Sequence, residues 1–288
     1  MADISAAEVK RLREKTGAGM MECKNALVAA EGDFAKAEKQ LKEKGLAALE
    51  KRADRATNEG KIFVKTKGSD AAMVELSCET DFVARNPDFI MLGDVIADKV
   101  IEKGLSGPND ELNGLVTELA TRIRENMSLK RIKLVKAAPN QYLTQYIHGD
   151  GKIGVVVKCE SDNPEIFKNE EIRSFIFSLA LHIAAFNPLA LDRSKIDPAW
   201  LKEQEEIFRK QMELDEKLKS KPANVLDGIL KGKVNKFLAD ICMLEQGYVK
   251  DEKLTVSQAI AECAKKACAK LAVSEYAYFR VGGSDGGE

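Results

Sequence analysis

The sequence carries no excess of charge of either sign. It holds 45 lysine and arginine residues against 46 aspartate and glutamate residues, for a formal net charge of −1. Proteins that neutralise many phosphates usually carry a clear basic excess, so we expect no direct binding to nucleic acid. The alternation of one local basic run is more typical of the solvated face of a strand: Lys130, Arg131, Lys133 and Lys136.

Long apolar runs are also missing. The longest apolar stretch, residues 175–186, is interrupted by Ser178 and His182, whereas a helix needs about 20 apolar residues to span a bilayer. The first residues show no basic segment followed by an apolar core, which is the pattern of a secretion signal. We therefore expect a cytoplasmic protein with no membrane partner.

Cysteine and histidine are few and scattered. The six cysteines include no CxxC pair, and the chain has only two histidines. Zinc sites and redox motifs need closely spaced ligands, so we expect neither a metal nor a cofactor. The cysteines fit reduced, buried thiols in a cytoplasmic protein.

Motifs of catalysis are lacking as well. Gly17-Ala18-Gly19 has neither the preceding strand nor the third glycine of a dinucleotide-binding fingerprint, and no Gly-Lys-Ser/Thr phosphate loop occurs. His148 falls at a predicted hairpin turn with no nucleophile motif nearby, which favours an interface or structural role. Acids near predicted strand ends are typical of a solvated surface: Glu79, Asp81 and Glu160. We expect a protein that is not an enzyme.

The sequence pattern predicts three short helices within residues 1–55. Ser5 and Glu8 form a capping-box pattern ahead of the first helix, and Asp33 can cap the third. Three glycines separate the helices: Gly17, Gly19 and Gly32. Residues 52–60 are polar and aperiodic, and we interpret them as a linker.

A weak internal repeat follows. Each copy begins with a predicted hairpin, with turns at 68–70 and 149–151, and then carries a Cys-Glu-Thr/Ser-Asp motif at 78–81 and 159–162. Each continues through an Asn-Pro pair that suits a helix start, two helical segments and a closing strand. The pattern predicts an α+β fold with a core of two related β-β-α-α-β subdomains. The predicted boundaries are 56–140 for one subdomain, and 141–186 with 251–282 for the other.

The second copy differs by a long insertion, residues 187–250. Its apolar residues recur at helical spacing on both sides of Lys219-Ser220-Lys221-Pro222, which predicts an antiparallel helical hairpin. Such a hairpin could support a homodimer, contact a second partner or pack on its own core, and the sequence leaves these alternatives open.

The first copy differs by four additional residues, Phe82 to Arg85, between its acidic motif and its Asn-Pro pair. The other copy turns the same corner without them, so folding does not require them. Two interpretations remain for the aromatic at this tip. Phe82 either folds back onto its own sheet, which is the commoner fate of phenylalanine, or stays exposed and seeks a partner.

Two segments resemble a known family. Residues 12–27, from Leu12 to Leu27, are similar to the N-terminal motif of the elongation factor Ts family, and residues 75–86 resemble its second motif. The resemblance extends more loosely through 146–149 and 153–155. It implies a guanine-nucleotide exchange factor for elongation factor Tu, with an N-terminal ubiquitin-associated-like domain, a core of two related subdomains and an inserted helical hairpin.

The resemblance also implies which residues meet the partner. In that family the Thr-Asp-Phe-Val segment intrudes near the Mg²⁺ site of the partner, a role that falls here on Thr80, Asp81, Phe82 and Val83. Two further positions match the family's partner interface: Lys24 and His148.

This chain departs from the family pattern at two positions. Arg124 stands where many members have glycine, and Lys250 stands where methionine is frequent. These departures concern the second contact surface rather than the Phe82 tip.

Overall fold

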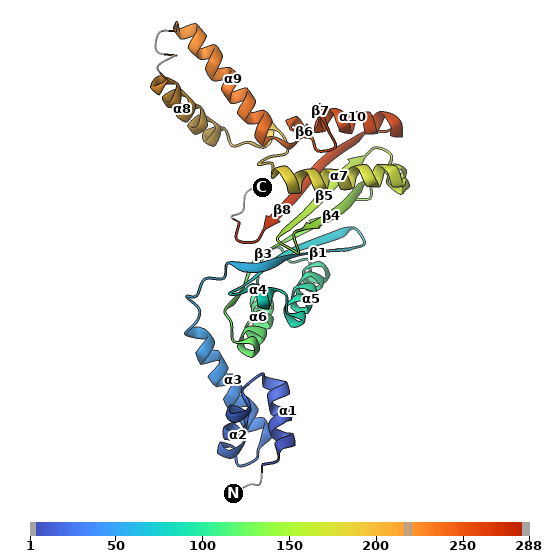
Figure 1. Ribbon diagram of the computed structural model, residues 1–288. Helices are drawn as coiled ribbons and strands as arrows, with labels where there is room; N and C mark the ends of the chain where they lie inside the picture. The colour runs from blue at the N-terminus through green and yellow to red at the C-terminus, as the bar shows by residue number, and fades with distance from the viewer. Residues whose placement is uncertain (1–3, 216–217, 219–220, 284–288) are drawn as a thin grey trace.

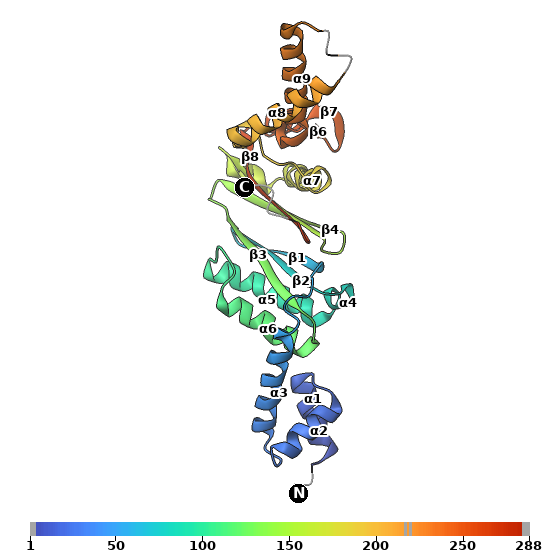
Figure 2. The same ribbon diagram turned by 90° about the vertical axis from the view of Figure 1, so that its left-hand side faces the viewer.

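The computed structural model describes residues 4–215, 218 and 221–283. The chain is elongated, with the N-terminal helices at one end, a helical hairpin at the other and two sheets between them (Figures 1 and 2). Helices and small antiparallel sheets both contribute, so the predicted α+β class is confirmed. Among the described helices, none combines the length and the apolar character needed to cross a bilayer.

The three predicted N-terminal helices are present as α1 (Ala6–Thr16), α2 (Met20–Ala29) and α3 (Phe34–Glu50). Ser5 and Glu8 form the expected reciprocal capping box, and the Asp33 side chain accepts a hydrogen bond from the Lys36 N–H. These helices share a small hydrophobic core of their own that includes Leu12, Cys23 and Leu27.

The predicted linker, residues 52–60, extends two residues too far at its C-terminal end, because β1 (Glu59–Lys67) begins at Glu59. The polar, glycine-containing sequence suggested a loop, but Gly60 pairs with Ser77 within the sheet. Gly60 has φ 148°, and a Cβ at this position would overlap the Leu76 carbonyl oxygen. Glycine here permits a close approach of two strands instead of a turn.

The first sheet is antiparallel in the order β1-β2-β3, with β2 spanning Asp70–Cys78 and β3 spanning Met127–Lys136. Between β2 and β3 the chain forms α4 (Asp81–Ala84), α5 (Pro87–Lys103) and α6 (Asp110–Ile123). Side chains of these helices pack on one face of the sheet around the fully buried Phe89.

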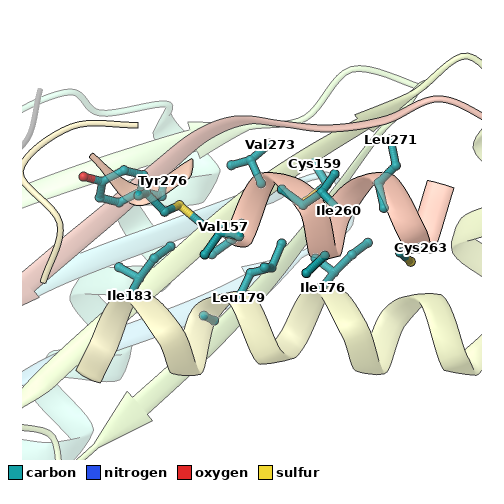
Figure 3. Packing of buried hydrophobic residues seen from close by; sticks show 14 of the residues in the cluster. Val157, Cys159, Ile176, Leu179, Ile183, Ile260, Cys263, Leu271, Val273 and Tyr276 are labelled. Carbon is teal, nitrogen blue, oxygen red and sulfur yellow. The ribbon is translucent and has the colours of Figure 1, made fainter. Parts of the chain in front are cut away.

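The second sheet repeats this arrangement in the order β4-β5-β8, with bounds Gln141–His148, Ile153–Ser161 and Leu271–Arg280. Its covering helices are α7 (Glu170–Phe186) and α10 (Val256–Ala267). Figure 3 shows their apolar side chains in one core with those of the sheet, among them Val157, Leu179 and Ile260. The predicted helix start at Asn163-Pro164 is the 3₁₀ helix η1 (Pro164–Lys168), after which Asn169 caps α7.

The remaining faces of the two sheets pack against each other. Ile62, Met73, Val156 and Phe279 meet in a shared hydrophobic cluster. At one end the Ile62 N–H donates to the Gly151 carbonyl oxygen at 2.7 Å, which ties β1 to the β4–β5 turn. The two sheets therefore form a stack, with helices on its outer faces.

The predicted helical hairpin is present as α8 (Pro198–Leu214) and α9 (Ala223–Ile241), which share a hydrophobic cluster containing Met212, Leu230 and Leu238. It projects from the end of the molecule opposite the N-terminus (Figure 1). Leu218 lies beyond the end of α8, and Lys219 and Ser220, in the predicted turn of the hairpin, fall outside the described residues. The short elements η2 (Arg193–Lys195), η3 (Met243–Glu245), β6 (Gly247–Tyr248) and β7 (Asp251–Thr255) complete the insertion and its return to α10.

Candidate functional site

Three of the four additional residues of the first copy, Phe82 to Ala84, lie in the short helix α4 (Asp81–Ala84) at the corner between β2 and α5, and the fourth, Arg85, is its C-cap. Thr80 is its N-cap, and the Thr80 side chain accepts a hydrogen bond from the Val83 N–H at 3.3 Å. Asn86 then caps α5 through the Asp88 N–H at 2.8 Å. Two caps in seven residues explain why this segment forms a compact turn instead of an open loop.

Phe82 projects from this corner with 82% of its surface exposed, the largest exposed fraction among the described large apolar residues. The alternative in which this ring folds back onto its own sheet is therefore wrong. Val83 and Ala84, the next two residues, are buried in the core of the first sheet. The corner is thus anchored by one apolar side chain while its neighbour extends into solvent. We call α4 with its exposed Phe82 ring the prong.

Asp81 is the first residue of the prong and is half-exposed. Its carboxylate pairs with the Arg85 guanidinium at 3.5 Å, one turn further along the chain. This is a solvent-exposed i,i+4 pair, so its contribution to stability is small, about 0.3–0.5 kcal/mol. The Asp81 carboxylate is accordingly available to another positively charged group.

Glu125, in the turn between α6 and β3, supports the base of the prong. Its carboxylate accepts hydrogen bonds from the Thr80 N–H at 3.1 Å and the Thr80 hydroxyl at 2.7 Å. The Cys78 thiol donates to the Thr80 carbonyl oxygen at 3.1 Å. Burial, reinforced by Glu125 and Glu59, raises the pKa of Cys78 to about 12, so this thiol keeps its proton.

The same turn holds the segment that follows α3. The Asn126 N–H donates to Glu79 at 2.6 Å, and this hydrogen bond is the main cause that lowers the pKa of Glu79. The Asn126 side chain donates to the carbonyl oxygens of Ala53 and Arg55 at 3.0 and 2.8 Å. Sequence analysis assigned no role to Glu125 and Asn126, which follow directly after Arg124, the one position of that turn discussed there.

Arg124 connects the turn to the N-terminal helices. Its guanidinium hydrogen-bonds the Glu22 carboxylate of α2, which lowers the pKa of Glu22 to about 2 together with the Gly19 N–H. A cleft of about 400 Å³ lies beside this pair, between the N-terminal helices and α6. Arg124 has φ 68°, a left-handed conformation that favours glycine.

His148 lies at the end of β4, exposed, with its Nδ1 2.9 Å from the Tyr146 hydroxyl oxygen. The turn after it reaches the first sheet, where Asp150 pairs with Lys61 at 2.6 Å. The hydrogen bond from Lys61 is the main cause that lowers the pKa of Asp150, and the charge of Arg85 contributes less. Lys152, just after this turn, pairs with Glu59, which lies opposite Cys78 near the base of the prong. The His148 turn and the prong therefore lie at the same end of the sheet stack.

Lys24 lies apart from the other predicted site residues, on α2 (Figure 1). It is exposed, and residues one turn away on either side of it, Met20 and Val28, are exposed apolar side chains. Lys250, one of the departures from the family pattern, is exposed in the β6–β7 turn. Val83 is buried, and the other predicted residues lie in separate surface patches instead of one pocket.

The side chains of these patches are suited to binding another molecule. Among the described residues, no group of three His, Cys, Asp or Glu side chains is placed to hold a metal ion. The prong offers an apolar ring with a carboxylate beside it, and its base is fixed by hydrogen bonds. Such an arrangement can fill an apolar pocket of another molecule and perturb polar groups next to that pocket.

Comparison with known proteins gives consistent matches. A family model described as Elongation factor TS matches residues 79–283. A protein of Treponema denticola named Elongation factor Ts is 52% identical over 281 residues, which cover 97% of this chain and 99% of the relative. Proteins of the same name from Treponema pallidum and Borrelia garinii are 43% and 41% identical over 291 and 283 residues. Both of these alignments cover at least 97% of this chain and 99% of the relative.

Proposed function

Because this chain belongs to the elongation factor Ts family, we propose that it is the guanine-nucleotide exchange factor for elongation factor Tu in the cytoplasm. It binds Tu·GDP, disturbs the Mg²⁺ site, promotes release of GDP and stays associated until GTP binds. The observation that carries the proposal is the prong, where Phe82 is exposed on a corner whose base is buried and hydrogen-bonded.

Exchange of this kind needs no covalent chemistry, and we propose that the protein is not an enzyme in that sense and uses no cofactor. A GTPase that holds GDP with nanomolar affinity has about 12 kcal/mol of binding free energy. The factor must bind the nucleotide-free form more tightly than the GDP form. Because coupling between two ligands is reciprocal, GDP or GTP then weakens the binding of the factor.

Phe82 can supply part of that coupling. Burial of a phenylalanine side chain is worth about 1.5–3 kcal/mol, which is enough to displace a loop or helix that positions a metal ion. Asp81 beside it can compete for hydrogen bonds around Mg²⁺. Thr80 and Val83 act from within the chain, since Val83 is buried and Thr80 caps α4. Loss of the metal leaves the diphosphate charge poorly neutralised.

Other surfaces contribute area and orientation. Lys24 with its exposed apolar neighbours, and His148 at the end of β4, are proposed further contacts with elongation factor Tu. The separate hydrophobic clusters support the proposed division into residues 1–55, a core of two related subdomains and an inserted hairpin.

The hairpin carries a second hypothesis, self-association. Ile207 and Leu214 on α8 are exposed by 46% and 81%. A homodimer through this face would bury both side chains. Sedimentation equilibrium of the full chain tests it, and a Leu214→Glu variant should then shift a dimer to monomer. A monomer at all accessible concentrations would exclude the homodimer.

The main experiment follows release of a fluorescent GDP analogue from purified elongation factor Tu by stopped-flow fluorescence. Addition of this protein should accelerate release by orders of magnitude, and a stable complex should form without nucleotide and dissociate when GDP is added. An unchanged release rate at saturating protein would refute the proposed function.

A further inference from the structure

Glu125 directs both of its carboxylate oxygens to one residue, the N-cap of the prong. Oε2 accepts from the Thr80 N–H at 3.1 Å and Oε1 from the Thr80 hydroxyl at 2.7 Å, across 45 positions of sequence. No ion pair of Glu125 occurs within the part of the chain that the structure describes. The carboxylate therefore meets two donors of Thr80 instead of a cation.

The hydroxyl of Thr80 carries this restraint into α4. The hydroxyl has one proton to donate and lone pairs to accept with. Because its proton points to Glu125, a lone pair is left facing the Val83 N–H, which lies 3.3 Å away. Glu125 thus orients the cap that starts the helix on which Phe82 stands.

A helix as short as α4 depends on such a restraint. It has four residues, and a single helical turn is unfavourable on its own, because nucleation fixes several backbone dihedrals for one hydrogen bond. The buried side chain of Val83 anchors the far side of the turn. With Glu125 at the near side, the turn that carries Phe82 is held at both ends.

The second half of the molecule shows that the fold does not need a carboxylate here. Thr80 corresponds to Ser161 in the repeat, and Cys78 pairs with Met127, so the register continued by two residues places Thr80 opposite Glu125. In the second half, Ser161 pairs with Leu271, which is buried and apolar. That corner has no prong, and it forms with a leucine at the corresponding position.

We propose that Glu125 is a positioning residue of the exchange site, which acts through Thr80 to fix the direction of the Phe82 ring. The inference rests on the proposed exchange function. A ring held in one direction loses less conformational freedom when it enters a partner pocket. The entropic cost of binding is then smaller, and more of the free energy of ring burial is available to displace the groups that hold Mg²⁺.

The test compares Glu125→Ala, Glu125→Gln and Thr80→Val in the full chain, each with and without Phe82→Ala. Glu125→Ala and Thr80→Val should slow GDP release from elongation factor Tu by about ten-fold, the loss expected for one charge-assisted hydrogen bond. Glu125→Gln keeps one acceptor oxygen and should show a smaller loss. A further variant, Thr80→Ser, keeps the hydroxyl and should exchange GDP at the wild-type rate. Glu118→Ala, an exposed acid on α6, is the matched control with no expected change.

The double variants distinguish a positioning role of Glu125 from a general effect on stability, because only a positioning role makes the effects of Glu125→Ala and Phe82→Ala on exchange non-additive. If Glu125 acts through the ring, Glu125→Ala should slow exchange by less than about two-fold when Phe82 is already alanine. An equal loss in both backgrounds would overturn the proposal. A normal rate for Glu125→Ala alongside a slow Phe82→Ala protein would overturn it too, while the exchange function stands.

A second measurement needs no partner and remains decisive if the exchange function itself fails. Exchange of the Val83 and Ala84 amide hydrogens in the free protein should become about ten-fold faster in Glu125→Ala, with unchanged protection in β5 and α7. Unchanged protection of the Val83 and Ala84 amides would overturn the positioning role regardless of the result with elongation factor Tu.

Discussion

Phe82 and Val83 are adjacent in the sequence and face opposite ways, the first with 82% of its surface exposed and the second with 7%. The pair divides two tasks between neighbouring side chains. Val83 joins the core beneath the first sheet, and Phe82 extends from the helix that Val83 anchors. This relationship predicts that substitutions at the two positions separate function from stability.

Phe82→Ala should reduce nucleotide exchange while folding stays intact. Loss of about 1.4 kcal/mol of contact energy at the partner corresponds to a ten-fold slower release, and we expect a ten-fold loss or more. Because the ring is exposed, the free energy of unfolding should change by less than about 0.5 kcal/mol. Met91→Ala, at an exposed apolar residue on the adjacent helix α5, is the control and should retain the rate. Equal rates for Phe82→Ala and wild type would remove the prong from the mechanism.

Val83→Ala should show the converse behaviour. Removal of two buried methyl groups costs about 1–3 kcal/mol of stability, which chemical denaturation measures directly. Exchange should slow less than in Phe82→Ala at temperatures where the variant is folded, since the ring is still present. A fully stable Val83→Ala protein would show that α4 is not anchored by this side chain.

Local signals in the sequence account for much of the fold. The capping residues Ser5 and Asp33 mark helix starts that the structure confirms, because a cap acts within three residues of itself. The repeat identified Phe82 to Arg85 as additional residues that folding does not require, but two of them, Val83 and Ala84, are buried in the core of the first sheet. Sequence could not decide whether Phe82 is exposed, since burial depends on what the rest of the sheet leaves uncovered.

Long-range contacts explain what was missed. Glu125 meets Thr80 only because β2 and β3 pair in one register, which no local pattern specifies. Gly60 was assigned to a linker because its strand role depends on the approach of Leu76 from the neighbouring strand. Arg124 was noticed as a departure from a family pattern, but its contact with Glu22 joins segments about a hundred residues apart.

Arg124→Gly should loosen the N-terminal helices from α6 with little change in overall stability. Glycine suits the left-handed backbone at this position, but it removes the ion pair with Glu22. A partly exposed pair is worth at most about 1 kcal/mol, so cleavage by trypsin at residues 51–55 should accelerate by no more than about five-fold. Glu22→Gln, which leaves the backbone of the turn untouched, should give the same acceleration.

Acid should have the same effect as these substitutions. The pKa of Glu22 is lowered from 4.5 to about 2, so its contribution is fully present above pH 4.5 and is lost as the pH falls towards 2. A fluorescence-transfer pair on α2 and α6 should therefore report separation over this range in wild type. If Arg124→Gly shows an identical acid transition, the transition does not belong to this pair.

His182 predicts a second pH dependence, nearer neutrality. It is fully buried on α7, with Nε2 2.9 Å from the Gln246 side-chain oxygen. The Gln246 amide donates to the Asp240 carbonyl oxygen, which turns its oxygen towards the ring, so His182 is the donor and Nδ1 is left without a hydrogen-bond partner among the described residues. Protonation would place a charged N–H in the apolar core, and burial accordingly lowers the pKa of His182 from 6.5.

The lowered pKa of His182 determines how the free energy of unfolding changes with pH. Below pH 6.5 the unfolded chain takes up a proton at this histidine while the folded chain does not, so the contribution to stability is full above that pH and is lost as the pH falls. The free energy of unfolding from urea titrations should decline by up to about 1.4 kcal/mol per pH unit between pH 6.5 and 5.5. His182→Gln keeps a donor for Gln246 but cannot titrate, so its decline should be shallower even if the variant is less stable throughout. His148→Gln removes the exposed histidine and should keep the wild-type slope. If His148→Gln flattens the slope and His182→Gln does not, the pH dependence does not belong to His182.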